Sequence, residues 1–179
     1  MAQEQVLSNV HDFATGNSLA SQFVEGVRFL HDQNVAHLDL KPHNIVITAT
    51  MRLKIIDFGV SVRVSNLESW IEGYRGTKGW AAPELENDPD AKYQPIRADL
   101  WSAGRVLQFF SQRVSGKFKF AFLVGPLLEH NPRQRPYLSD ISQDALMVKP
   151  KRKRSVDVLK KEMVKRQRVQ PCDPSPMAA

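Results

Sequence analysis

The sequence predicts a mainly α-helical domain that also contains small β-hairpins. Residues 18–34 have the periodicity of an amphipathic helix, residues 99–110 that of a buried helix, and residues 45–47 and 53–56 are short β-branched strand candidates. The chain has 179 residues, of which 42% are hydrophobic and 25% charged, as is usual for a globular protein. We therefore expect one folded domain followed by a tail.

The chain is expected to begin with a short segment, residues 1–17, that leads into the first long helix. The apolar positions of this segment have helical spacing that breaks at residues 15–17, so it forms a short helix at most; they are Val6, Leu7, Val10 and Phe13. Ser18 is the expected N-cap of the long helix, which ends near residue 34. One face of that helix is apolar: Leu19, Phe23, Val27 and Leu30.

Four polar residues lie around the expected hairpin at 45–56. Asp39, Lys41 and Asn44 precede its first strand and Asp57 follows its second, so the hairpin should bring their side chains together. Two carboxylates, an amide oxygen and an ammonium are the groups that hold hard metal ions and a transferring phosphate. The sequence therefore predicts a phosphoryl-transfer site, although polar residues that merely close turns are the simpler alternative.

Three motifs resemble those of eukaryotic-type serine/threonine protein kinases, in the order and spacing of that family. They are HLDLKPHN at residues 37–44, DFG at 57–59 and APE at 82–84. The resemblance implies a protein kinase-like fold, and Lys41 is typical of the serine/threonine branch. It covers about residues 18–146 and implies the C-terminal, large lobe of a kinase.

The resemblance also implies roles for the site residues and ATP with Mg²⁺ as the cofactor. Asp39 would accept the proton of the substrate hydroxyl, and Lys41 would neutralise charge on the transferred group and so contact ATP. Asn44 and Asp57 would bind the metal ion. Thr77, in the substrate-facing loop 76–80, would contact Asp39 and Lys41 and is counted with them as catalytic.

Further residues are expected to support the site without reacting. By resemblance, the His37 ring packs near Phe58 and hydrogen-bonds backbone, and Asp99 accepts hydrogen bonds from the backbone of the catalytic loop. Glu84 is expected to pair with Arg135. Leu38 departs from the family, because most kinases have an arginine there that pairs with a phosphate on the activation segment, which would be residues 57–84 here.

The remaining elements should complete the domain near residue 148. A helix is expected to begin at Asp99, and only residues 114–119 separate it from the next apolar run at 120–128. Kinases usually have another helix there that docks substrates and regulators. A last short helix is expected from Tyr137 to about Met147.

The small lobe of a kinase has no counterpart in this sequence. We find neither a Gly-rich loop nor a strand with a phosphate-binding lysine. Three interpretations remain open: a serine/threonine kinase that is active only when a small lobe completes it, a pseudokinase-like protein-interaction module, or a fragment of a longer kinase. In each, the face that a small lobe covers should bind a protein substrate or a capping partner.

The basic charge of the chain is concentrated in the expected tail, residues 149–179. Residues 1–148 contain 15 Lys and Arg against 16 Asp and Glu, a net charge of −1, whereas residues 149–179 contain 10 against 3, a net of +7. Clusters at 151–154 and 165–168 have the spacing of a bipartite nuclear import signal, which predicts an import receptor as partner. A solvated, disordered tail and nonspecific nucleic-acid contact are the alternatives.

An intracellular location is expected, in the nucleus if the tail directs import and otherwise in the cytoplasm. No apolar run is long enough to cross a bilayer, so no membrane partner is expected, and the N-terminus lacks the pattern of a secretory signal. The single cysteine, Cys172, has no partner for an internal disulfide, as is typical of a reducing compartment.

Overall fold

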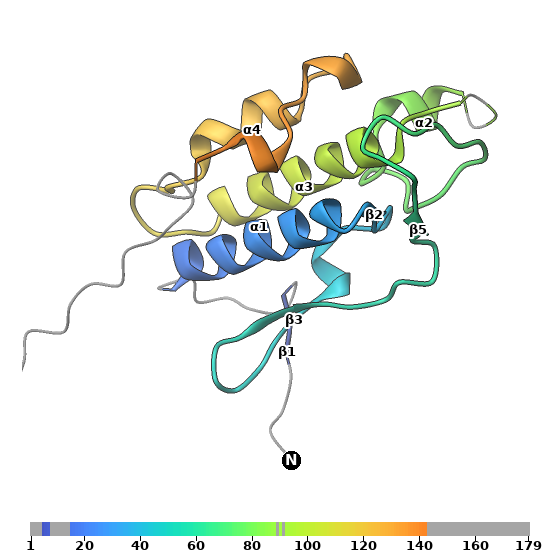
Figure 1. Ribbon diagram of the computed structural model, residues 1–179. Helices are drawn as coiled ribbons and strands as arrows, with labels where there is room; N and C mark the ends of the chain where they lie inside the picture. Colours follow the sequence, from blue (N-terminus) through green and yellow to red (C-terminus); the bar gives the residue numbers. More distant parts are fainter. Residues whose placement is uncertain (1–4, 8–14, 89, 91, 143–179) are drawn as a thin grey trace, which may run out of the picture. The chain divides into compact units, whose positions relative to one another are not determined.

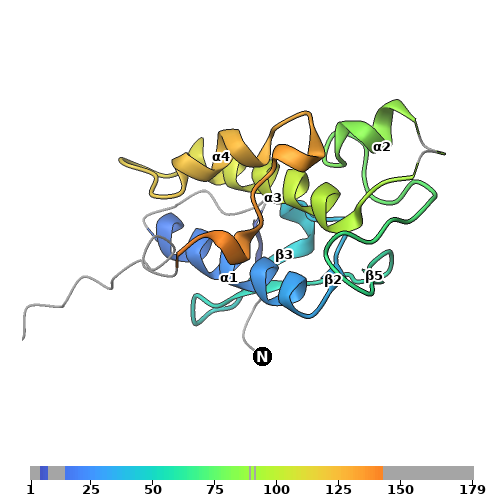
Figure 2. The ribbon, with the colours of Figure 1, turned by 45° about the horizontal axis from the view of Figure 1, so that its top comes forward.

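Three helices with apolar faces pack against one another and form most of the core. They are α1 (Gly16–Asp32), α3 (Pro95–Ser111) and α4 (Ala121–Leu127). Figure 1 and Figure 2 show α3 between α1 and α4, with α1 and α3 side by side. Phe23 of α1 and Phe110 of α3 are fully buried, and their ring centroids are 6.3 Å apart. The helical patterns of the sequence therefore correctly predicted α1 and α3, whereas α4 was predicted only as an apolar run at 120–128.

The computed structural model describes residues 5–7, 15–88, 90 and 92–142. The chain divides into two units, residues 1–148 and 149–179, and all described residues belong to the first. The predictions for Val10, Phe13, the basic clusters and Cys172 thus concern residues outside the described part. None of the described helices has both the length and the apolar composition needed to span a membrane.

The predicted cap of α1 at Ser18 is wrong. The helix begins at Gly16 with Thr15 as N-cap, and the Ser18 amide donates to the Thr15 carbonyl inside the first turn. Asn17 explains the earlier start, because its side chain donates to the Lys117 carbonyl and accepts from the Lys119 amide. The loop before α4 thus holds the first turn of α1 in place.

The predicted hairpin is confirmed as β3 (Ile45–Ile47) and β4 (Leu53–Ile55), paired with Ile45 opposite Ile55. The outer edge of β3 pairs with β1 (Gln5–Val6), and Leu7 is fully buried in the core. The predicted helical character is therefore wrong at Val6, which lies in β1, because backbone pairing with the free edge of β3 outweighs a short apolar period.

A second small sheet lies at the end of α1. It pairs β2 (Val35–Ala36) with β5 (Val62–Arg63), antiparallel. The residues between β2 and β3 form the candidate catalytic loop, which ends in the 3-10 helix η2 (Pro42–Asn44). Both ends of this loop are therefore anchored in β-structure.

The remaining elements are short, and two predicted boundaries differ from those observed. The helix α2 (Pro83–Asn87) is followed by α3, which begins at Pro95 rather than Asp99 because a proline is favourable in a first helical turn. The 3-10 helices η3 (Pro132–Gln134) and η4 (Leu138–Asp140) follow α4. The helix predicted from Tyr137 is thus only a 3-10 turn as far as residue 142, and its remainder lies outside the described residues.

Candidate active site

The backbone of the candidate catalytic loop is hydrogen-bonded to Asp99, a fully buried carboxylate in α3. Its Oδ2 accepts from the His37 amide at 3.1 Å and its Oδ1 accepts from the Leu38 amide at 2.8 Å. The His31 ring, at the end of α1, donates to the same carboxylate at 2.8 Å. The expected contact between Asp99 and the loop backbone is confirmed, and α1, α3 and the loop meet at this one group.

Leu38 occupies a strained backbone conformation at the point where two loops touch. Its φ angle is 64°, which is uncommon for a residue with a side chain. Its side chain is buried against Ala82, Leu85 and Ile96. Gly76 passes so close that a Cβ there would lie 2.5 Å from the Leu38 carbonyl oxygen. The catalytic loop and the loop that carries Thr77 therefore touch through their backbones.

Four of the predicted site residues form one hydrogen-bonded cluster, which we call the Asp39 cluster: Asp39, Lys41, Asn44 and Thr77. The Lys41 ammonium lies 2.7 Å from Asp39 Oδ2 and donates to Thr77 Oγ1 at 2.6 Å. The Thr77 hydroxyl in turn donates to Asp39 Oδ1 at 2.6 Å. Asn44 Nδ2 donates to Asp39 Oδ2 at 2.8 Å and to the Asp39 carbonyl at 2.9 Å.

These donors control the ionisation of Asp39. Burial raises the pKa of its carboxyl, but hydrogen bonds from Lys41, Thr77 and Asn44, together with the charge of Lys41, outweigh burial and hold the pKa below the ordinary value of 3.8. Asp39 is therefore ionised at neutral pH and can only accept protons or hydrogen bonds.

Asp57 lies beside the Asp39 cluster without joining its hydrogen bonds. The Ile56 amide donates to the Asn44 carbonyl at 2.9 Å, which places the next residue near Asn44. Asp57 itself is exposed, has a φ of 65° and accepts from the Gly59 amide at 3.3 Å. In the described part of the chain, no hydrogen bond joins its carboxylate to Asn44.

His37 connects the turn around Asp57 to the catalytic loop. Its Nε2 donates to the Ile56 carbonyl at 3.0 Å, and its ring lies 4.8 Å from that of Phe58. The ring is fully buried. The structural role expected for His37 is confirmed.

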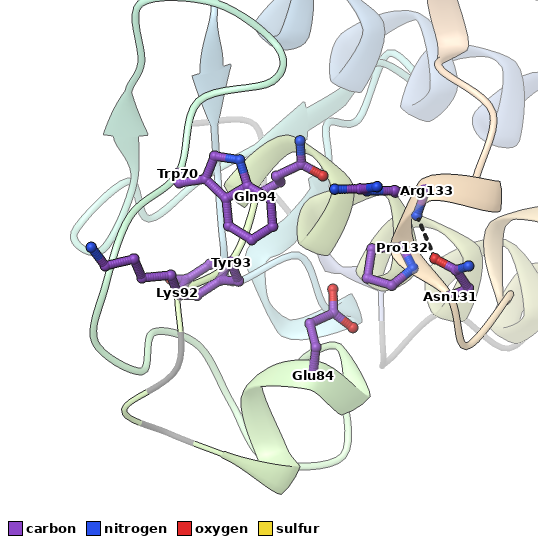
Figure 3. Close-up of a pocket in the computed structure, with 8 residues that line it drawn as sticks. All are labelled: Trp70, Glu84, Lys92, Tyr93, Gln94, Asn131, Pro132 and Arg133. Carbon is purple, nitrogen blue, oxygen red and sulfur yellow. Dashed lines mark hydrogen bonds between the residues drawn. The ribbon is translucent and has the colours of Figure 1, made fainter.

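Glu84 and Arg135 form the expected ion pair at the other end of the activation segment. Arg135 is fully buried and donates to both carboxylate oxygens of Glu84, at 2.7 and 2.8 Å. Figure 3 shows Glu84 facing a pocket of about 220 Å³, whose wall includes Trp70, Tyr93 and Arg133. This pocket lies where the activation segment, α2 and η3 approach one another.

Sequence reasoning missed two supporting residues. His31 binds Asp99 from 68 positions away, and Ser102 of α3 donates to the Trp80 carbonyl at 2.9 Å. In the sequence, His31 and Ser102 are recognisable only as polar residues on the buried face of a predicted helix. Such a side chain must find a partner, but the sequence does not say which.

Comparison with known proteins identifies relatives over most of the described chain. The family model described as the protein kinase domain matches residues 4–121. The chain is 33% identical over 140 residues to serine/threonine-protein kinase ULK3 of Xenopus laevis, covering 72% of this chain and 29% of that protein. It is 45% identical over 91 residues to serine/threonine-protein kinase 17A of Oryctolagus cuniculus, covering 48% of this chain and 21% of that protein.

A third relative is the calcium/calmodulin-dependent protein kinase type II of Caenorhabditis briggsae, 31% identical over 109 residues, or 59% of this chain and 20% of that protein. The chain therefore spans less than a third of the length of each of these relatives. The family match covers more than half of the chain and includes the catalytic loop, the DFG turn and α3. The chain belongs to the eukaryotic-type protein kinase family.

Proposed function

We propose that this chain is the large lobe of a serine/threonine protein kinase and that phosphoryl transfer requires a small lobe. That lobe would come from further sequence of the same protein or from another polypeptide. The observation that carries the proposal is the Asp39 cluster, in which a carboxylate, an ammonium, an amide and a hydroxyl meet within hydrogen-bonding distance.

In this proposal Asp39 accepts the proton of a serine or threonine hydroxyl as that hydroxyl attacks phosphorus. The low pKa of Asp39 keeps it ionised, so it can orient the hydroxyl before the proton moves. The Lys41 ammonium places a positive charge beside Asp39 Oδ2 and would stabilise the transferring phosphoryl group. Thr77 bridges the two and fixes their separation.

The side chains proposed to hold magnesium offer suitable ligand atoms. Among the residues that the structure describes, the Asn44 side chain forms hydrogen bonds only through its nitrogen, so its amide oxygen can face a cation. The Asp57 carboxylate is exposed, and within the same residues only its Oδ1 accepts a hydrogen bond, from Gly59. Hard oxygen donors of this kind suit Mg²⁺, which would neutralise charge on the phosphates of ATP.

We further propose that a small lobe or another protein covers the face around Phe58. Met51, Ile56 and Phe58 are 42%, 38% and 45% exposed, although all three are large apolar residues. Ile56 and Phe58 lie at the end of the hairpin that adjoins Asn44, whereas Met51 lies in the turn at its other end. A partner on this face would bury apolar surface worth about 25 cal/mol per Å².

The alternative function is a pseudokinase-like interaction module, and the same exposed residues favour it. A module of this kind would use the face around Phe58 to bind a partner and would leave the Asp39 cluster without a catalytic role. The two functions differ in one measurable property, which is phosphoryl transfer by a completed kinase domain.

The test is a fusion of the small lobe of a relative, such as that of the 33% identical Xenopus protein, ahead of this chain. We expect the fusion to transfer labelled phosphate from magnesium ATP to a serine-containing peptide, and Asp39→Asn to abolish transfer. Asp140→Asn, on the exposed part of η4, is the matched control and should retain activity. A folded, ATP-binding fusion without transfer would favour the interaction module.

A further inference from the structure

A second pocket lies on the C-terminal half of α3, outside the Asp39 cluster. It has a volume of about 420 Å³ and six lining residues: Trp80, Arg105, Gln108, Phe109, Gln112 and Arg113. Arg105, Phe109 and Arg113 follow one another at intervals of four residues, so they project from one side of the helix and the turn after it. The pocket thus contains two guanidinium groups, two amides and two aromatic rings, and no acid.

Both guanidinium groups are available to an anion. Neither forms an ion pair with a carboxylate in the part of the chain that the structure describes. Arg105 donates one hydrogen bond, to Gln108 Oε1 at 3.2 Å, and Arg113 donates one, to the Phe109 carbonyl at 3.4 Å. Because a guanidinium has five N–H donors, most donors of both groups form no hydrogen bond with the described residues.

Aromatic rings hold the two arginines in position. The Arg113 guanidinium lies 3.6 Å from the centroid of the Phe109 ring, and that of Arg105 lies 5.9 Å from the Trp80 ring. Such contacts restrict the side chains while leaving the N–H groups free. A ligand would therefore meet two guanidinium groups that already lie against aromatic rings.

The pocket is connected directly to the Asp39 cluster through Trp80. The Trp80 amide donates to the Thr77 carbonyl at 3.0 Å, and the Thr77 hydroxyl donates to Asp39. On its other side, the Trp80 carbonyl accepts from Ser102 of α3. A segment bound in this pocket would therefore lie beside the loop that reaches the candidate catalytic carboxylate.

We propose that this pocket binds the carboxylate side chains of an acidic peptide segment. The guanidinium groups of Arg105 and Arg113 would bind the carboxylates of the peptide. The side-chain amides of Gln108 and Gln112 would form hydrogen bonds with its peptide groups. The Trp80 and Phe109 rings would contact the aliphatic carbons of its side chains. A nucleic acid fits less well, because residues 1–148 carry a net charge of −1 and provide no extended basic face. The inference goes beyond the proposed function, because binding of a peptide here does not require phosphoryl transfer.

The test is fluorescence anisotropy of a labelled peptide that contains several aspartates, titrated with the full chain. The basic clusters at 151–154 and 165–168 both offer acidic peptides a competing site, so their lysines and arginines are replaced by glutamine in every protein used. We expect this chain to bind the aspartate peptide, and Arg105→Gln and Arg113→Gln each to weaken binding about fivefold or more. Higher salt should also weaken it.

Arg52→Gln is the matched control, because Arg52 is an exposed arginine in the turn between β3 and β4. It should leave the affinity unchanged, and a peptide with asparagine in place of aspartate should not bind. Far-ultraviolet circular dichroism and thermal unfolding establish that each variant is folded. Equal affinity in all four proteins, or binding of a phosphoserine peptide but not of the aspartate peptide, would overturn the assignment.

Discussion

At the scale of single residues, Asp39 is the group on which the proposed chemistry depends. Three side chains donate to it, and two of them, Lys41 and Asn44, lie within five positions in the sequence. Its folded pKa is lower than 3.8 because these donors stabilise the carboxylate more than burial destabilises it. The ionised carboxylate therefore stabilises the folded state as well as serving the proposed reaction.

This linkage predicts how stability depends on pH. The contribution of Asp39 is complete above its unfolded pKa and is lost as the pH falls through the lower folded value. The difference in unfolding free energy between the wild type and Asp39→Asn should thus be larger at about pH 7 than at about pH 3. Urea unfolding at both pH values measures it, and an equal difference at both would contradict the prediction.

Spacing in the sequence explains which site residues could be predicted without a structure. Asp39, Lys41 and Asn44 are close in the chain, so the loop itself brings them together. Thr77 lies 38 positions from Asp39 and was predicted only because the sequence resembles a known family. His31 was not predicted, because its partner Asp99 lies 68 positions away and no motif includes the pair.

At the scale of elements, the loop at residues 76–80 depends on two glycines with different surroundings. Gly76 has a φ of 113° and lies against the Leu38 carbonyl, whereas Gly79 has a φ of 81° and nothing within 4 Å of the position of a Cβ. At both positions the positive φ angle is unfavourable for a residue with a side chain. Only at Gly76 is there also no space for a Cβ atom.

Alanine at these two positions should therefore have unequal effects. Gly79→Ala should cost about 1 kcal/mol of unfolding free energy from its backbone conformation alone. Gly76→Ala should cost more and should also lower transfer by the completed kinase, because Leu38 and Thr77 would move apart. Denaturant unfolding and the peptide assay measure the two effects, and equal losses in both variants would disprove the steric explanation.

Hydrogen bonds to Glu68 connect the activation segment to α3 and to Tyr137. The Glu68 carboxylate accepts hydrogen bonds from Tyr137, Gln94 and Arg97. The hydrogen bond from Tyr137 is the largest cause of its lowered pKa, while burial and this bond raise the pKa of Tyr137 to about 12. Leu38 is buried in an apolar cluster and has no charge to offer a phosphate.

Leu38 cannot bind a phosphate on the activation segment. We therefore expect the small-lobe fusion to be active without phosphorylation of that segment. Phosphatase treatment of the small-lobe fusion should leave the rate of transfer nearly unchanged, whereas Glu68→Ala should lower it by loosening the segment. The rate of phosphate transfer to a serine peptide, measured before and after phosphatase treatment and for Glu68→Ala, tests both expectations. A collapse of the rate after phosphatase would mean that another basic side chain binds an activating phosphate.

Arg135 connects α2 to the turn at η3 and should contribute strongly to stability. Besides Glu84, its guanidinium donates to the carbonyls of Glu129 and Arg97. Arg135→Ala should cost about 3–5 kcal/mol, because it leaves a carboxylate and several carbonyls without a donor. Arg133→Ala, two positions away and exposed, is the control and should change stability by less than about 0.5 kcal/mol. Similar losses in both variants would refute the role of the ion pair.

At the scale of the whole molecule, the buried apolar residues of the described chain form two clusters, a larger one built mainly on α1, α3 and α4 and a smaller one that contains Leu38. Helices α1 and α3 were predictable from their apolar periods, and the hairpin from its two short β-branched runs. The pairing of β1 with β3 and the start of α1 were not, because a sheet edge and a loop distant in sequence determine them. Local patterns thus predicted the elements, and long-range contacts determined their boundaries.

The central claim is that the Asp39 cluster is assembled in this chain but needs a second lobe for phosphoryl transfer. Positioning of the reactants supplies about 7–11 kcal/mol in well-oriented reactions, and one lobe alone provides only part of it. The most direct test is incubation of the purified chain with labelled ATP, magnesium and a basic serine peptide. We predict that the wild-type chain incorporates no more labelled phosphate into the peptide than the Asp39→Asn variant does. Robust phosphate transfer by the wild type that Asp39→Asn abolishes would contradict the claim.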